Sequence, residues 1–142
     1  MFEPTRDQAR DFLFDLWRKH AAGEPLTPLE SLALSVVLEH PEYHAVLADR
    51  ERYLEREWRP EGGETNPFLH LSMHLAIEEQ LSIDQPPGIR AAVASLEKRL
   101  GQHDARHEVM DCLAEMVWQA QRNRAGFDNA AYLDCLRRKA AR

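Results

Sequence analysis

Several protein classes depend on features that this sequence lacks. It has two cysteines, Cys112 and Cys135, in 142 residues, and they form no Cys-x-x-Cys motif of the kind found in zinc ribbons and thioredoxin-like proteins. The longest nearly apolar run, Leu32 to Leu38, is far shorter than a membrane span. The N-terminus is charged at once and has no apolar segment typical of a secretory signal. We therefore predict a cytoplasmic protein with no membrane role and with free, reduced, half-buried cysteines.

An excess of positive charge is also missing. The 18 Lys and Arg residues are outnumbered by 24 Asp and Glu residues, which gives a formal net charge of −6. A domain that binds nucleic acid normally has a basic surface, so we predict no nucleic-acid partner. Only residues 122–142 are locally basic. We interpret them as a helix end whose positive side chains complement the helix dipole, with a phosphate contact as the alternative.

No segment has a convincing strand pattern, whereas helix signals recur along the chain. Thr27, Pro28 and Glu30 form a capping box with proline at the first helical position, and Asn66-Pro67 repeats that arrangement. Six helical segments cover residues 5–23, 27–40, 66–84, 89–100, 104–122 and 128 to the tail, and a further helical stretch with a bend near Asp49 covers 41–57. The segment 59–66, which contains two glycines, is the clearest loop. These patterns predict an all-α, single-domain helical bundle of five or six helices over residues 1–142.

Histidine is the residue type that is present in an unusual arrangement. Six of the seven histidines fall into three pairs spaced four residues apart, namely His40 with His44, His70 with His74, and His103 with His107. Random placement would give roughly 0.3 such pairs. Residues at this spacing share one face of a helix, so the pairs are candidate ligand sets.

The pair His70 and His74 is the strongest of the three, because Glu78 continues the same row on a helix that is otherwise apolar on almost every side. A buried polar row must find partners, since each unsatisfied polar group costs roughly 1–3 kcal/mol. Coordination of a metal ion satisfies that need. Hydrogen bonds within an ordinary core satisfy it equally well.

The other two pairs are weaker. His107 and Asp111, with His103 one turn earlier, lie opposite the apolar face of the helix over 104–122, which is typical of a solvated face. Proline at position 41 separates His40 from His44 and disfavours a shared helical face.

Established metal motifs are absent. The segment HLSMH over 70–74 has no glutamate where the zinc-protease motif requires one, and no Glu-x-x-His pair of the ferritin-like type occurs. The spacing of His-x3-Glu and His-x3-Asp is loosely similar to that of ligands in hemerythrin-like bundles, but in spacing alone.

Two hypotheses of function follow. The first is a bundle that binds a transition metal (Fe, Zn or Mn). Its predicted ligands are His70, His74 and Glu78 from one helix, His107, Asp111 and His103 from a facing helix, and His40 or His44 from a third segment. The alternative is a non-enzymatic interaction module, such as a homodimer, that uses apolar helix surface and the aromatic pair Trp58 and Phe68 beside the predicted loop. The sequence does not decide whether the protein is an enzyme.

Four segments resemble an uncharacterised family, the proteobacterial domain of unknown function 1841. They are EHPEYH over 39–44, TNPFLHLSMHLAIEEQLSIDQPPGIR over 65–90, HEVMDCLAEMVWQAQRNR over 107–124 and AYLDCLRR over 131–138. The resemblance implies a small, cytoplasmic, all-α bacterial protein and implies no activity. The histidines at 40, 44, 70, 74 and 107 lie inside these segments.

Overall fold

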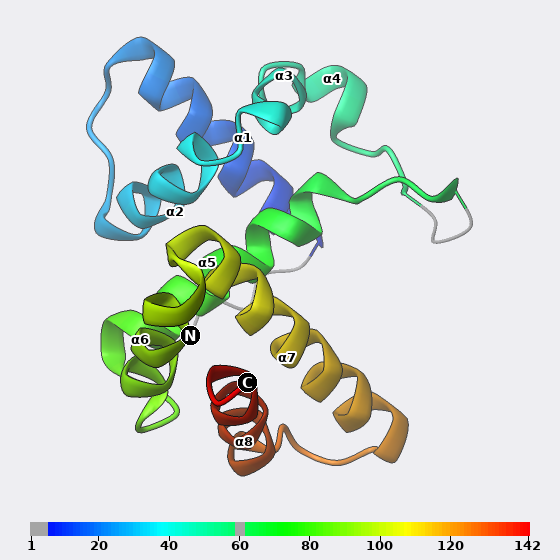
Figure 1. Cartoon of the computed structure of the whole chain (residues 1–142). Helices are drawn as coiled ribbons and strands as arrows, with labels where there is room; N and C mark the ends of the chain where they lie inside the picture. The colour runs from blue at the N-terminus through cyan, green and yellow to red at the C-terminus, as the bar shows by residue number, and fades with distance from the viewer. Residues whose placement is uncertain (1–5, 59–61) are drawn as a thin grey trace. The chain divides into compact units, whose positions relative to one another are not determined.

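The computed structural model describes residues 6–58 and 62–142 (Figure 1). Within these residues the chain is helical and has no strand, which confirms the all-α class. Position 5, where the first helix was expected to begin, and residues 59–61 of the predicted loop lie outside the described part, while residues 63–66 belong to no helix. None of the described helices is both long and apolar enough to cross a bilayer.

The described residues form eight α-helices and the short 3-10 helix η1 (Pro41–Tyr43), so the predicted number of five or six was too low. The difference arises mainly between residues 41 and 57, where η1, α3 (His44–Leu47) and α4 (Arg50–Tyr53) replace one expected helix. Asp49 explains the second break, because its side chain accepts a hydrogen bond from the Arg52 amide and so caps a new helix.

The chain divides into two compact units, Met1–Ala76 and Ile77–Arg142. The first contains α1 (Arg6–Ala22), α2 (Pro28–Leu38), η1, α3, α4 and the beginning of α5 (Pro67–Ile83). The second contains the end of α5 together with α6 (Ile89–Leu100), α7 (Gln102–Asn123) and α8 (Asn129–Ala140).

The first unit is built around apolar side chains from α1, α2, α3 and α5. They include Leu13, Phe14, Leu16, Val36, Val37, Leu47, Phe68, Leu71 and Leu75, all nearly or fully buried. The predicted capping box is present at the start of α2, where the Thr27 hydroxyl accepts from the Glu30 amide and the Glu30 carboxylate accepts from the Thr27 amide. At the start of α5, Asn66 Oδ1 accepts from the amides of Phe68 and Leu69.

Trp58 and Phe68, expected to be available to a partner, instead belong to this core. Phe68 is 3% exposed, and its ring meets the Trp58 ring edge-on at 5.7 Å between centroids. The guanidinium of Arg10 lies over both rings, at 5.3 Å and 4.7 Å from their centroids. Arg10 Nη1 also donates to the carbonyl oxygens of Tyr53, Leu54 and Arg56 at 2.7–3.2 Å.

In the second unit, α6, α7 and α8 pack against one another. Each contributes fully buried side chains, among them Val93, Leu96, Val109, Tyr132 and Leu136. The Tyr132 hydroxyl donates to Gln80 Oε1 at 2.8 Å. Arg106 on α7 donates to Glu78 at 2.7 Å and to Glu97.

A disulfide bond joins Cys112 on α7 to Cys135 on α8, so the prediction of free, reduced cysteines was wrong. The two Cα atoms are 6.0 Å apart, within the usual range for a disulfide. Cys112 is fully buried and Cys135 is half-buried. The two cysteines are 23 residues apart in sequence and meet because α7 and α8 pack against each other. Their spacing in the sequence therefore did not predict the bond.

Candidate metal centre

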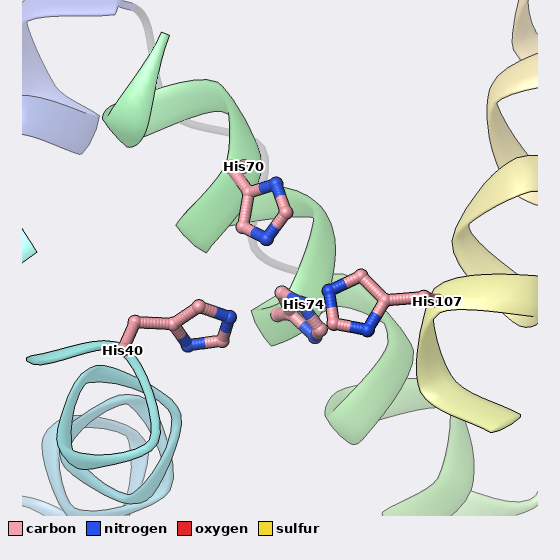
Figure 2. Close-up of side chains that lie close together, drawn as sticks. All are labelled: His40, His70, His74 and His107. Carbon is pink, nitrogen blue, oxygen red and sulfur yellow. The ribbon is translucent and has the colours of Figure 1, made fainter. Parts of the chain in front are cut away.

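Three of the predicted ligands, His40, His70 and His74, lie together in the first unit (Figure 2). The ring centroids are 4.5 Å apart for His40 and His74, 4.8 Å for His70 and His74, and 5.1 Å for His40 and His70. One ring nitrogen of each lies within 4.8 Å of those of the other two. The three imidazoles therefore form a cluster, called here the histidine cluster.

The α5 helix fixes two members of the histidine cluster. Asn66 caps its start and Pro67 occupies its first position, so His70 and His74 fall one turn apart on the same face. His74 is 4% exposed and His70 is half-buried. The sequence predicted this shared row from the four-residue spacing.

The third member, His40, comes from the connection between α2 and η1. Its side chain is 3% exposed, and its Nδ1 lies 2.8 Å from the carbonyl oxygen of Val36 in the last turn of α2. A carbonyl only accepts, so Nδ1 carries a proton and is the donor of this hydrogen bond. Its backbone amide also donates to the carbonyl of Val37, and its own carbonyl accepts from the Tyr43 amide. His40 is thus held by both its backbone and its ring.

His44 has a different role in the structure and does not join the histidine cluster. Its Nε2 donates to the Val37 carbonyl at 2.8 Å, and its ring packs on Trp17 at 4.4 Å between centroids. His40 and His44 together thus satisfy carbonyl groups at the end of α2. The following residue, Pro41, has no amide hydrogen to offer these carbonyls.

Tyr43 forms one wall of the histidine cluster, which the sequence did not predict. Its ring stacks on His40, with centroids 5.8 Å apart and planes 5° apart, and it meets His70 edge-on at 5.7 Å. Burial, with a smaller contribution from the charge of Glu42, raises the pKa of the Tyr43 phenol above its usual value. The phenol therefore stays protonated near neutral pH.

The remaining predicted ligands lie in the second unit and have protein partners there. Glu78 accepts from Arg106, and the exposed Asp111 lies 3.9 Å from Lys139. Burial alone would lower the pKa of the Arg106 guanidinium, but hydrogen bonds to Glu78 and Glu97 raise it. On α7 the rings of His103 and His107 are 4.5 Å apart, and His107 Nδ1 donates to the His103 carbonyl at 3.0 Å.

A family model described as "Domain of unknown function (DUF1841)" matches residues 5–138, which is nearly the whole chain. The match confirms the resemblance drawn from the four sequence segments. No curated protein and no solved structure matches the chain.

Proposed function

We propose that this chain, which belongs to the DUF1841 family, binds a first-row transition metal ion through His40, His70 and His74. The observation that carries the proposal is the convergence of three ring nitrogens within 4.8 Å in a largely buried place. A tetrahedral ion with metal–nitrogen bonds of about 2.0–2.1 Å needs its ligand nitrogens about 3.3 Å apart. Side-chain rotation would have to bring the three nitrogens, now within 4.8 Å of one another, to that spacing.

The chemistry of the donors narrows the choice of metal. Imidazole nitrogen suits zinc, iron, copper and nickel, whereas manganese prefers carboxylate and water oxygens. Among the predicted ions, the histidine cluster therefore favours zinc or iron over manganese. Three protein ligands also leave a fourth position on a tetrahedral ion for water or another ligand.

The hydrogen bond from His40 Nδ1 to the Val36 carbonyl supports the proposal independently of the distances. Ligand histidines in metalloproteins almost always donate their second ring nitrogen to a carbonyl or carboxylate, which fixes the tautomer and the ring orientation. His40 has this arrangement, and Nε2 is the nitrogen that would coordinate the metal ion.

The other ligands expected from the sequence stay predictions. His107 is the first of them to test, because it is a half-buried histidine in a segment that carries the family resemblance. Glu78 is a weaker candidate, since its carboxylate already accepts a charge-assisted hydrogen bond from Arg106.

Metal analysis of the full chain, purified without an affinity tag, tests the proposal directly. We expect close to one zinc or iron ion per chain, and a rise in melting temperature when metal is returned to the stripped protein. Less than about 0.1 ion per chain, together with no thermal shift on adding zinc, iron or manganese, would contradict it.

Substitutions then identify the ligands. His74→Ala and His70→Ala should each weaken zinc binding at least about 100-fold, because even outer-shell losses cost 10- to 100-fold. His20→Ala is the matched control, since His20 is an exposed histidine of the same unit outside the histidine cluster. His107→Ala reports on the predicted further ligand. Equal affinities for His20→Ala and His74→Ala would rule out the histidine cluster as the site.

A homodimer remains the second candidate, favoured by two exposed leucines of the first unit, Leu38 at 49% and Leu69 at 58%. Light scattering on the protein as it elutes from a size-exclusion column measures its oligomeric state. The measurement with and without zinc distinguishes the two functions. A metal-independent dimer that is lost in Leu69→Ser would favour the interaction module.

A further inference from the structure

We propose that the bond between Cys112 and Cys135 is a reversible thiol–disulfide switch that controls how firmly α8 is held in the second unit. The inference does not depend on metal binding. It rests on the position of the two sulfur atoms, on the contacts that hold α8 and on the charges beside Cys135.

Apart from this bond, α8 is held by its packing against α6 and α7 and by a few polar links. The helix has 12 residues, and two of its side chains, Tyr132 and Leu136, are fully buried. Helices of about this length are marginal in water unless packing holds them. Polar links to its neighbours include the Tyr132 hydrogen bond to Gln80, the ion pairs of Lys139 with Glu108 and Asp111, and the bond from Arg99 to the Lys139 carbonyl.

The disulfide closes a loop that contains the end of α7, the connection and the start of α8, with 23 residues of sequence separation. A covalent link of this kind removes conformational freedom from the open state of the chain more than from the closed state. Breaking it therefore shifts the equilibrium towards an opened α8, while the remaining contacts are unchanged.

The two cysteine residues differ in exposure. Cys112 is fully buried on α7, whereas Cys135 is half-buried on α8 and lies one helical turn from Arg138. Positive side chains attract an incoming thiolate. The sulfur of Cys135 is accordingly the point of attack.

The reaction we infer is exchange with a dithiol. One thiolate of the reductant attacks the Cys135 sulfur and forms a mixed disulfide, while the Cys112 sulfur leaves and takes up a proton. The second thiol of the reductant, as its thiolate, attacks the mixed disulfide, closes the reductant's own disulfide and releases Cys135, which is protonated in turn. Two electrons and two protons pass to the protein, and a disulfide oxidant such as oxidised glutathione reverses the step.

Hydrogen exchange of the full chain, oxidised or reduced and with chelator present in both cases, measures the switch. We expect amides over residues 129–140 to exchange on the order of 100-fold faster after reduction. The helices α1 and α2 serve as internal references. This comparison needs no substitution, so it holds even if cysteine variants fold poorly.

The double variant Cys112→Ala/Cys135→Ala is the matched control. It should show the faster exchange without any reductant and should not respond to a dithiol. Equal protection of 129–140 in the oxidised and reduced chain would overturn the proposal. So would two freely alkylated cysteines after equilibration with a mixture of oxidised and reduced glutathione.

Discussion

Both units of the chain are helical, but the interactions that stabilise each of them differ. Four of the five buried polar residues in the described part of the chain, namely Arg10, Glu30, His40 and His74, lie in the first unit. The second unit contains the disulfide and several polar links between its helices. The first unit thus buries most of these polar groups, and the second has a covalent link between two of its helices.

This difference has a physical consequence for each unit. A buried polar group costs free energy unless its hydrogen bonds or charges are matched, so the first unit depends on a small number of well-placed partners. Cross-links act mainly by restricting the opened chain, so the second unit depends on connections that can be made or broken. Substitutions that remove a similar number of interactions should therefore lower the free energy of unfolding by different amounts in the two units.

The largest effect is expected from Arg10→Ala in the first unit. The substitution removes the side-chain donor to three carbonyl groups and takes the guanidinium from the faces of Trp58 and Phe68. We expect the free energy of unfolding to fall by about 3 kcal/mol, measured by urea denaturation. Arg6→Ala is the matched control, because Arg6 lies on the same helix and its hydrogen bond to the Glu55 carbonyl and its ion pair with Glu57 are exposed. Similar losses in both variants would show that the buried contacts of Arg10 have no special weight in the first unit.

A smaller effect is expected from Tyr132→Phe in the second unit. The substitution leaves the buried Gln80 side chain without its donor at an expected cost of about 1–2 kcal/mol. The double variant Tyr132→Phe/Gln80→Leu should recover most of that loss, since both polar partners are then gone. A double variant less stable than the single one would contradict this account.

Tyr132 also predicts a dependence on pH. Burial raises the pKa of its phenol, so the folded chain keeps this proton at pH values where the unfolded chain has lost it. The contribution of Tyr132 to the free energy of unfolding is fully present below about pH 10, the usual pKa of a tyrosine phenol in an unfolded chain. It falls as pH rises beyond that value. In Tyr132→Phe the decline above pH 10, followed by circular dichroism, should be less steep.

The smallest effects are expected at helix caps, and they should be equal in the two units. Thr27→Ala removes the cap of α2, and Asp128→Ala removes the side-chain acceptor of the Ala131 amide at the start of α8. Each should cost about 1 kcal/mol, because capping is a local interaction. Hydrogen exchange of the first turn of each helix checks it, with Thr27→Ser as the conservative control. A cap that costs far more in one unit would show that tertiary contacts are involved.

Features that depend on neighbours in sequence were predictable. The caps at Thr27 and Asn66 and the shared face of His70 and His74 follow from residue types at fixed spacing. Features that depend on how helices pack were not. His40 entered only as one of several residues that could complete a site, and nothing local indicated that Cys112 and Cys135 form a bond.

The partner of Glu78 shows the same limit. Its place in a row with His74 made it a natural third ligand, yet its carboxylate binds Arg106, which lies 28 residues away. Local spacing gives the face on which a side chain lies. It does not give the oppositely charged group that another helix brings to that face.

Gly101, the one residue between α6 and α7, has φ 84° and ψ 164°. A Cβ atom added there would meet nothing within 4 Å, so the position has room for a side chain and is restricted by the backbone alone. The restriction is therefore one of handedness. D-alanine, the mirror-image residue, would adopt these torsion angles without strain, whereas L-alanine would be strained. The connection between α6 and α7 therefore excludes L side chains because of their chirality and not because of their size.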